Sequence, residues 1–99
     1  MNITVNELKD CLSAHGPINI IDVRGELEFH TFNIGGENIP LGILLTEINE
    51  LKYNKDEAVV VVCQRGLRSE TARRVLKDHG YTNVKNLTGG LLAWARAQL

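Results

Sequence analysis

The sequence predicts an α/β fold in which helices cover both faces of a central, mostly parallel sheet. Short apolar runs that are typical of buried strands alternate along the chain with segments of helical periodicity. The clearest run, residues 58–62, reads Ala-Val-Val-Val-Val and has no polar side chain, as expected of a parallel strand covered on both faces. A chain of 99 residues suffices for one modest core, so we expect a single domain over residues 1–99.

Apolar patterning places the elements in a regular order. The expected strands are short buried runs, at residues 19–23, 58–62 and 84–87. The expected helices have apolar residues spaced three or four apart, at residues 5 to about 16, 26–31, around 44–51, 70–79 and 91–98. In the third helix the apolar stripe consists of Leu44, Leu45, Ile48 and Leu51. Strands that alternate with helices in this way pair in parallel.

Capping signals mark the ends of two of these helices. Thr4 and Glu7 form a capping box that opens the first helix, which we expect to stop near Gly16-Pro17. Gly80 follows the fourth helix and is expected to end it. In such sheets ligands bind at the carboxyl ends of the strands, and Asp22, Arg24 and Cys63 all fall there.

The segment Cys63-Gln64-Arg65-Gly66-Leu67-Arg68 directly follows the strand at 58–62, and helical periodicity begins at about Ser69. The backbone N–H groups of such a loop and the dipole of the helix beyond it both favour negative charge, so they stabilise a thiolate. Arg65 and Arg68 add two cations nearby. The pattern predicts that Cys63 is an activated nucleophile in a loop that holds an anion, with a positive φ at Gly66.

The segment from Cys63 to Ser69 resembles the active-site loop of rhodanese-family sulfurtransferases, C-x-x-G-x-R-S. Four other segments match family patterns in the family's order: Ile20–Arg24, Glu28-Phe29, Asn38–Leu41 ("NIPL") and Val84–Trp94 ("V-x-x-L-x-GG-x-x-x-W"). The resemblance covers nearly the whole chain and implies a rhodanese-like three-layer fold.

The segment at residues 32–38 departs from the usual rhodanese pattern. It lacks the histidine of Gly-His-Ile-x-Gly-Ala and is slightly shorter. Its Asn-Ile-Gly-Gly form is similar to rhodanese domains of E1-like adenylyltransferases, which supply sulfur for cofactor synthesis. We expect this difference to affect how substrate reaches the site.

The resemblance implies a sulfurtransferase without cofactor or metal. A sulfane sulfur from thiosulfate or another persulfide donor would pass through a Cys63 persulfide to a thiophilic acceptor. The implied catalytic residue is Cys63, and the implied substrate-binding residues are Gln64, Arg65, Gly66, Leu67, Arg68 and Ser69. Asp22 and Arg24 have a supporting role, either at the edge of the site or in an internal salt bridge that includes Glu28.

Two other functions compete with this interpretation. Cysteine-based phosphatases and arsenate reductases have five residues between cysteine and arginine, whereas Cys63 and Arg68 enclose four, so the shorter loop favours sulfur over phosphate. The second alternative is a persulfide relay or binding module for a cysteine desulfurase or a sulfur-carrier pathway, with low activity on thiosulfate. Cys63 is present, which disfavours a pure scaffold.

Bulk composition argues against several other classes of protein. Eleven basic and twelve acidic residues leave a net charge of −1, so we expect no nucleic-acid partner and no anionic membrane partner. No apolar run approaches the roughly 20 residues of a membrane span, and no signal-peptide pattern is visible. Two cysteines without such a signal indicate reduced thiols. We therefore expect a cytoplasmic monomer.

The remaining chemistry-bearing side chains are expected to be structural. Cys11 flanks the apolar stripe of the first helix and should pack there. His15, His30 and His79 lack the spacing of metal ligands, so we expect no metal site. Trp94 should anchor the last helix in the core.

Overall fold

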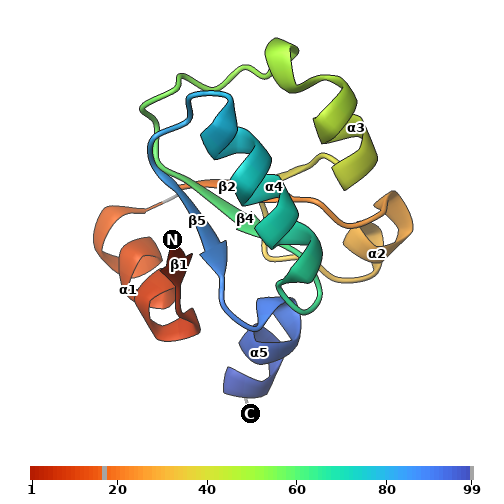
Figure 1. The fold of residues 1–99 in the computed structure, drawn as a ribbon. Coiled ribbons are helices and arrows are strands. Elements are labelled where there is room, and N and C mark those ends of the chain that lie inside the picture. Colours follow the sequence, from red (N-terminus) through yellow and green to blue (C-terminus); the bar gives the residue numbers. More distant parts are fainter. Residues whose placement is uncertain (17, 99) are drawn as a thin grey trace.

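A five-stranded parallel sheet forms the middle layer of the protein, as a computed structural model of the chain shows (Figure 1). The structure describes residues 1–16 and 18–98. The strand order is β1-β5-β4-β2-β3, and the strands are β1 (Asn2–Ile3), β2 (Asn19–Asp22), β3 (Glu37–Asn38), β4 (Val59–Val62) and β5 (Val84–Leu87). All four pairings are parallel. The expected α/β fold with a mostly parallel sheet is confirmed.

Helices cover both faces of this sheet. They are α1 (Val5–His15), α2 (Glu26–Thr31), α3 (Leu41–Thr46), α4 (Leu67–Asp78) and α5 (Gly90–Ala97), with a 3₁₀ turn at Ile48–Glu50. Alternate residues of a strand point to opposite faces, so Val59 and Val61 of β4 pack with α3 and α4. Val60 and Val62 pack with α1 and α5 on the other face. The all-valine strand is therefore buried on both sides, as its composition predicts.

Four of the expected elements are present with bounds that agree within one residue: the strands at 19–23, 58–62 and 84–87 and the helix at 26–31. The capping box is confirmed: the Glu7 carboxylate accepts from the Thr4 N–H at 2.8 Å, and the Thr4 hydroxyl accepts from the Glu7 N–H at 3.1 Å. Gly16 follows α1 directly, and Pro17 lies outside the described residues. Trp94 is partly buried against the α1 side of the core.

Three expectations about the elements were wrong or incomplete. The two-residue edge strands β1 and β3 are not among the expected strands, because two residues carry no periodicity. The fourth helix begins at Leu67 instead of residue 70, since Gly66 allows the loop to turn into the helix at once. The expected helix around 44–51 is divided into α3 and the 3₁₀ turn, so Leu44 and Ile48 are buried whereas Leu45 is exposed.

The parallel pairing brings the carboxyl ends of three strands together. Asp22 of β2 lies beside Val62 of β4, and Asn86 of β5 lies beside Val61. The residues that follow these strands therefore meet at one edge, where α4 begins. None of the helices within the described residues is long and apolar enough to cross a membrane.

Candidate active site

The Cys63 side chain lies at the carboxyl end of β4 beneath a tight loop, and it is only 1 % exposed. Gly66 turns this loop with a φ of 91°, in the left-handed region that glycine tolerates best, as expected. The Cys63 sulfur accepts hydrogen bonds from the N–H groups of Gly66 at 3.1 Å and Ser69 at 3.3 Å. The Ser69 hydroxyl lies 3.2 Å from the same sulfur. These polar contacts form a pocket for a negatively charged sulfur atom.

Opposing effects act on the pKa of the Cys63 thiol. Burial raises the pKa, because a thiolate loses its hydration there. The hydroxyl of Ser69 and the backbone N–H groups of Ser69, Arg65 and Gly66 lower the pKa and outweigh burial. The pKa of Cys63 is therefore below that of an ordinary thiol, which favours the nucleophilic thiolate.

A second layer of polar contacts lies directly behind the sulfur. The Ser69 hydroxyl is 2.5 Å from the side-chain oxygen of Asn86, and the Asn86 amide nitrogen donates to the Gly66 carbonyl at 3.0 Å. Asn86 was not among the expected site residues. The signal that could have identified it was a polar amide on the same face of the expected strand as the apolar Val84.

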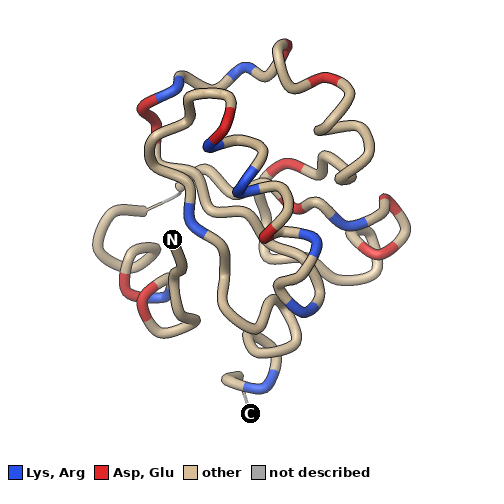
Figure 2. Tube along the Cα trace, viewed as in Figure 1, with Lys and Arg blue, Asp and Glu red and all other residues tan. Residues whose placement is uncertain are grey.

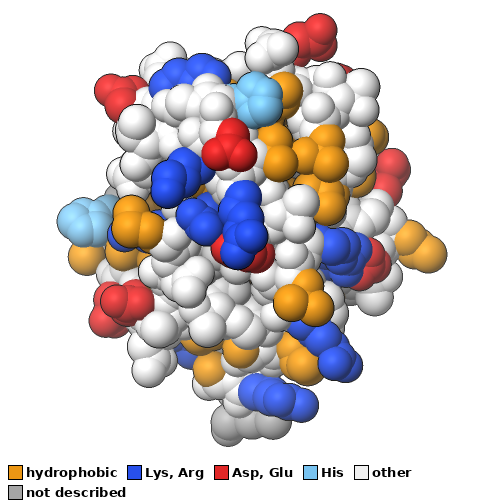
Figure 3. All heavy atoms as spheres, viewed as in Figure 1, with side chains coloured by type: hydrophobic (Ala, Val, Ile, Leu, Met, Phe, Trp, Pro, Cys, Tyr) orange, Lys and Arg blue, Asp and Glu red, His pale blue; other side chains and the backbone are white. Residues whose placement is uncertain are grey.

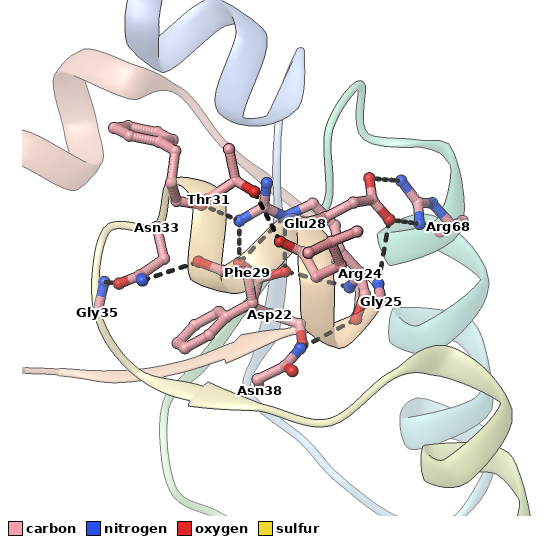
Figure 4. Close-up of polar contacts among 12 residues, drawn as sticks. Asp22, Arg24, Gly25, Glu28, Phe29, Thr31, Asn33, Gly35, Asn38 and Arg68 are labelled. Carbon is pink, nitrogen blue, oxygen red and sulfur yellow. Dashed lines mark hydrogen bonds and ion pairs between the residues drawn. The ribbon is translucent and has the colours of Figure 1, made fainter.

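Arg68 lies at the opening of the loop and forms a two-pronged ion pair with Glu28 of α2. The two guanidinium nitrogens lie 2.8 and 2.9 Å from the two carboxylate oxygens (Figure 4). Glu28 also accepts from the Gly25 N–H at 3.1 Å, which caps α2. The hydrogen bonds from Arg68 are the largest cause that lowers the pKa of Glu28 to about 2. The carboxylate therefore competes with any bound anion for the Arg68 guanidinium.

Asp22 and Arg24 form a buried salt bridge with an N–O distance of 2.8 Å (Figure 4). Arg24 also donates to the Phe32 carbonyl at 2.5 Å, so it fixes the start of the segment at 32–38. The internal salt bridge, one of the two roles considered for this pair, is present, and Arg24 also lines a cavity next to the Cys63 loop. Glu28, which we expected to join it, is hydrogen-bonded to Arg68 instead.

An open cavity of about 310 Å³ leads to the Cys63 loop. Its lining contains most of the expected loop residues and one residue of α2: Glu28, Cys63, Gln64, Arg65, Leu67 and Arg68. A neighbouring cavity of about 430 Å³ shares Glu28 and Gln64 with it and extends to Phe32. The histidine-lacking segment thus borders the approach to the site. Gly66 and Ser69 are buried, so they contact the sulfur and not the open cavity.

Basic side chains are also present farther along α4, outside the loop. Figure 2 marks the basic positions along α4, and Figure 3 shows basic side chains gathered over this face of the molecule. Arg73 and Arg74 both pair with Glu70, at 2.8 and 3.0 Å, so one of their two positive charges is balanced locally.

The second cysteine lies away from this site. Cys11 of α1 is partly buried against the core formed with α5, as expected, and both cysteines are free thiols. The Nδ1 atom of the His79 ring lies 2.8 Å from the Val75 carbonyl oxygen, near the end of α4.

A family model described as "Rhodanese-like domain" matches residues 4–97. The chain belongs to the rhodanese family. A sulfurtransferase from Allochromatium vinosum is 40 % identical over 95 residues, which cover 95 % of this chain and 87 % of that protein. The crystal structure of a rhodanese-like domain protein from Staphylococcus aureus has 32 % identity and a TM-score of 0.83, and the match covers 95 % of this chain and 91 % of that one.

Other rhodanese relatives are longer proteins. The probable adenylyltransferase/sulfurtransferase MoeZ of Mycobacterium tuberculosis is 33 % identical over 95 % of this chain, which spans 24 % of MoeZ. The putative sulfur carrier protein YrkF of Bacillus subtilis is 33 % identical over 93 % of this chain, which spans 49 % of YrkF. The similarity to an adenylyltransferase/sulfurtransferase agrees with the resemblance noted for the segment at 32–38.

Proposed function

We propose that the protein is a sulfurtransferase that carries a sulfane sulfur as a persulfide on Cys63. One observation carries the proposal: a buried sulfur accepts two backbone hydrogen bonds at the end of a cavity that Arg65 and Arg68 line. Such a site stabilises a thiolate before the reaction and a persulfide anion after it. Substrate-binding roles for Gln64, Leu67 and the two arginines are part of this proposal.

The reaction consists of two displacements. The Cys63 thiolate attacks the outer sulfur of thiosulfate, the sulfur–sulfur bond of the donor breaks, and sulfite leaves with the bonding electron pair. A persulfide remains on Cys63. A thiol acceptor or cyanide then takes the outer sulfur and releases the Cys63 thiolate, so no net oxidant is required. Arg65 attracts the anionic donor, and Arg68 does so when it separates from Glu28.

A relay function remains the second candidate. The bidentate pair between Glu28 and Arg68 partly neutralises the cation that a dianionic donor needs, which favours a persulfide delivered by another protein. The similarity to a putative sulfur carrier supports the same function. In both cases we propose that the protein is cytoplasmic and acts as a monomer. Its proposed partners are small thiols or a sulfur-relay protein, and we propose no nucleic-acid or membrane partner.

The two cysteines provide a direct test. After brief treatment with thiosulfate, intact-protein mass spectrometry should show a gain of one sulfur atom in the native protein and in Cys11→Ser. Cys63→Ser should gain no sulfur and form no thiocyanate from cyanide, while its thermal unfolding shows that it is folded. Sulfur uptake or turnover by Cys63→Ser would contradict the proposal.

The donor distinguishes the remaining candidates. A protein that gains sulfur rapidly from a protein persulfide but slowly from thiosulfate is a relay. Hydrolysis of para-nitrophenyl phosphate faster than consumption of thiosulfate would instead identify a phosphatase, and it would contradict the argument from loop length.

A further inference from the structure

Asn86 is a buried polar residue in the central part of the sheet, and only 6 % of it is exposed. It lies in β5 beside Val61 of β4, so its side chain is at the level where the Cys63 loop begins. Its amide makes hydrogen-bonding contacts with the turn of that loop at Gly66 and with the first turn of α4 at Ser69. No role in sulfur transfer follows from the family pattern at this position.

The orientation of the Asn86 amide follows from its neighbours. The Gly66 carbonyl, 3.0 Å away, can only accept, so the Asn86 atom that faces it is the NH₂ group. The Glu70 carboxylate, 3.5 Å from the same nitrogen, requires the same assignment. The Asn86 oxygen must then face the Ser69 hydroxyl at 2.5 Å. That oxygen is an acceptor and attracts the hydroxyl proton.

The Ser69 hydroxyl has only one proton, and two acceptors compete for it. When Cys63 is a thiol, its S–H can donate to the Ser69 oxygen, and the Ser69 O–H can donate to Asn86. When Cys63 is a thiolate, the sulfur 3.2 Å from the hydroxyl can only accept. Ser69 can stabilise the anion only if its O–H turns away from Asn86.

We propose that Asn86 is a positioning residue: it holds the Ser69 O–H while Cys63 is a thiol and releases it to the sulfur when the thiolate forms. The thiol proton leaves to solvent through the open cavity, and the hydroxyl only rotates. This inference rests on the proposed function, in which the Cys63 thiolate is the nucleophile. Its consequence is that Asn86 stabilises the resting thiol relative to the thiolate.

Other charged groups lie near the Cys63 loop or near Asn86 and must stay unchanged in a test. They come from the end of β2 and the residues after it, from α2, from the loop and from α4: Asp22, Arg24, Glu28, Arg65, Arg68, Glu70 and Arg73. An uncharged replacement of Asn86 leaves all of these charges in place and removes only the contacts of its amide, which include the 3.5 Å contact with Glu70.

The experiment is a pH titration of the Cys63 thiol in the Cys11→Ser background, followed by the ultraviolet absorbance of the thiolate. Asn86→Leu removes the competing acceptor, so the pKa of Cys63 should fall by about one unit, the equivalent of one hydrogen bond. Asn86→Asp keeps the volume but strengthens the acceptor, so the pKa should rise. Asn83→Leu, at the residue just before β5, is the matched control and should cause no change.

Ser69→Ala separates positioning from a merely structural role. Without the hydroxyl, the shift caused by Asn86→Leu should disappear, and the rise caused by Asn86→Asp should shrink to the effect of its charge. An unchanged titration in Asn86→Leu, or a shift that persists in Ser69→Ala, overturns the inference. If Asn86→Leu does not fold, Asn86→Asp provides the test instead. If Asn86→Asp raises the pKa of Cys63 equally with Ser69 present and in Ser69→Ala, the inference is overturned. The titration uses no sulfur donor, so its result is independent of whether the protein transfers sulfur.

Discussion

The guanidinium of Arg68 lies within reach of two negative groups, the Glu28 carboxylate and the Cys63 thiolate. The hydrogen bonds that Arg68 donates to the Glu28 carboxylate are the largest cause that raises the pKa of Arg68, and Cys63 contributes further. Both side chains of the ion pair are about two-fifths exposed, so solvent screens their attraction and an anionic donor can compete with it. Glu28 therefore determines how far the positive charge of Arg68 is available to bind an anionic donor.

Substitutions on the two sides of this ion pair should have opposite effects on the use of thiosulfate. Glu28→Gln leaves the Arg68 cation unpaired, so kcat/KM for thiosulfate should rise, by roughly threefold to tenfold. Arg68→Ala removes a charge-assisted hydrogen bond to the donor, so kcat/KM should fall about tenfold. Thiocyanate formation at low and high salt measures both effects, which high salt should reduce. A loss of activity in both variants would show that the pair acts only by bracing the loop against α2.

At the scale of elements, the close contact between α5 and the Cys63 loop restricts what the loop can do. The N–H groups of Leu91 and Leu92 donate to the carbonyls of Cys63 and Gln64 at 2.9 and 3.0 Å. A Cβ atom on Gly90 would lie 2.5 Å from both carbonyl oxygens, and the φ of this residue is 65°. Only glycine allows the start of α5 to approach the loop so closely.

Gly90→Ala should therefore disturb the fold and the site together. We expect the free energy of unfolding to fall by about 1–3 kcal/mol and sulfur uptake to decrease, because the loop must move away from α5. Gly42→Ala in α3 is the control: its Cβ would meet no atom within 4 Å, so the helix should gain about 0.5–1 kcal/mol. Urea unfolding measures both changes. Equal stability of Gly90→Ala and the native protein would show that the loop tolerates displacement.

Elements and site residues were predictable from the sequence where the signal is local. The strand Val59–Val62, the capping box and the short helix Glu26–Thr31 are encoded by neighbouring residues, and they are found as expected. The edge strands have too few residues to show a pattern, and they form only because β2 and β5 offer them partners.

The same limit applies to the candidate site. Cys63 and Ser69 are close in sequence, and a short loop motif identifies them together. Glu28 and Arg68 are separated by 40 positions, and Ser69 and Asn86 by 17. The partners in these pairs are chosen by tertiary packing, because the parallel sheet brings the ends of distant strands side by side. Hydropathy patterns predict that arrangement but not which side chains meet within it.

At the scale of the whole molecule, two carboxylates in ion pairs connect stability to acidity. Glu28 pairs with Arg68, and Glu70 pairs with Arg73 and Arg74. Hydrogen bonds from these arginines are the largest cause that lowers the pKa of each carboxyl to about 2, from a usual value of 4.5. Because the pKa is lower in the folded state, the contribution to stability is complete above about pH 4.5 and is lost as the pH falls towards 2.

The double variant Glu28→Gln with Glu70→Gln lacks both carboxyls. Its free energy of unfolding should depend less on pH between about 4.5 and 2 than that of the native protein. Partly exposed pairs contribute at most about 1 kcal/mol each, so the effect is small but cumulative. Urea unfolding between pH 2 and 6 measures it. Glu47→Gln, an exposed residue outside the ion pairs of the described chain, is the control and should keep the native slope. An unaltered slope in the double variant would assign acid sensitivity to other groups.

The two edges of the sheet, β1 and β3, are each two residues long. A long, flat edge offers a row of free N–H and C=O groups on which a strand of another chain can pair, which is a common route to aggregation. These edges are too short to pair with more than a few residues of such a strand. We therefore expect concentrated solutions of the folded protein to resist fibril formation, and association between copies to depend on side-chain contacts instead of added strands.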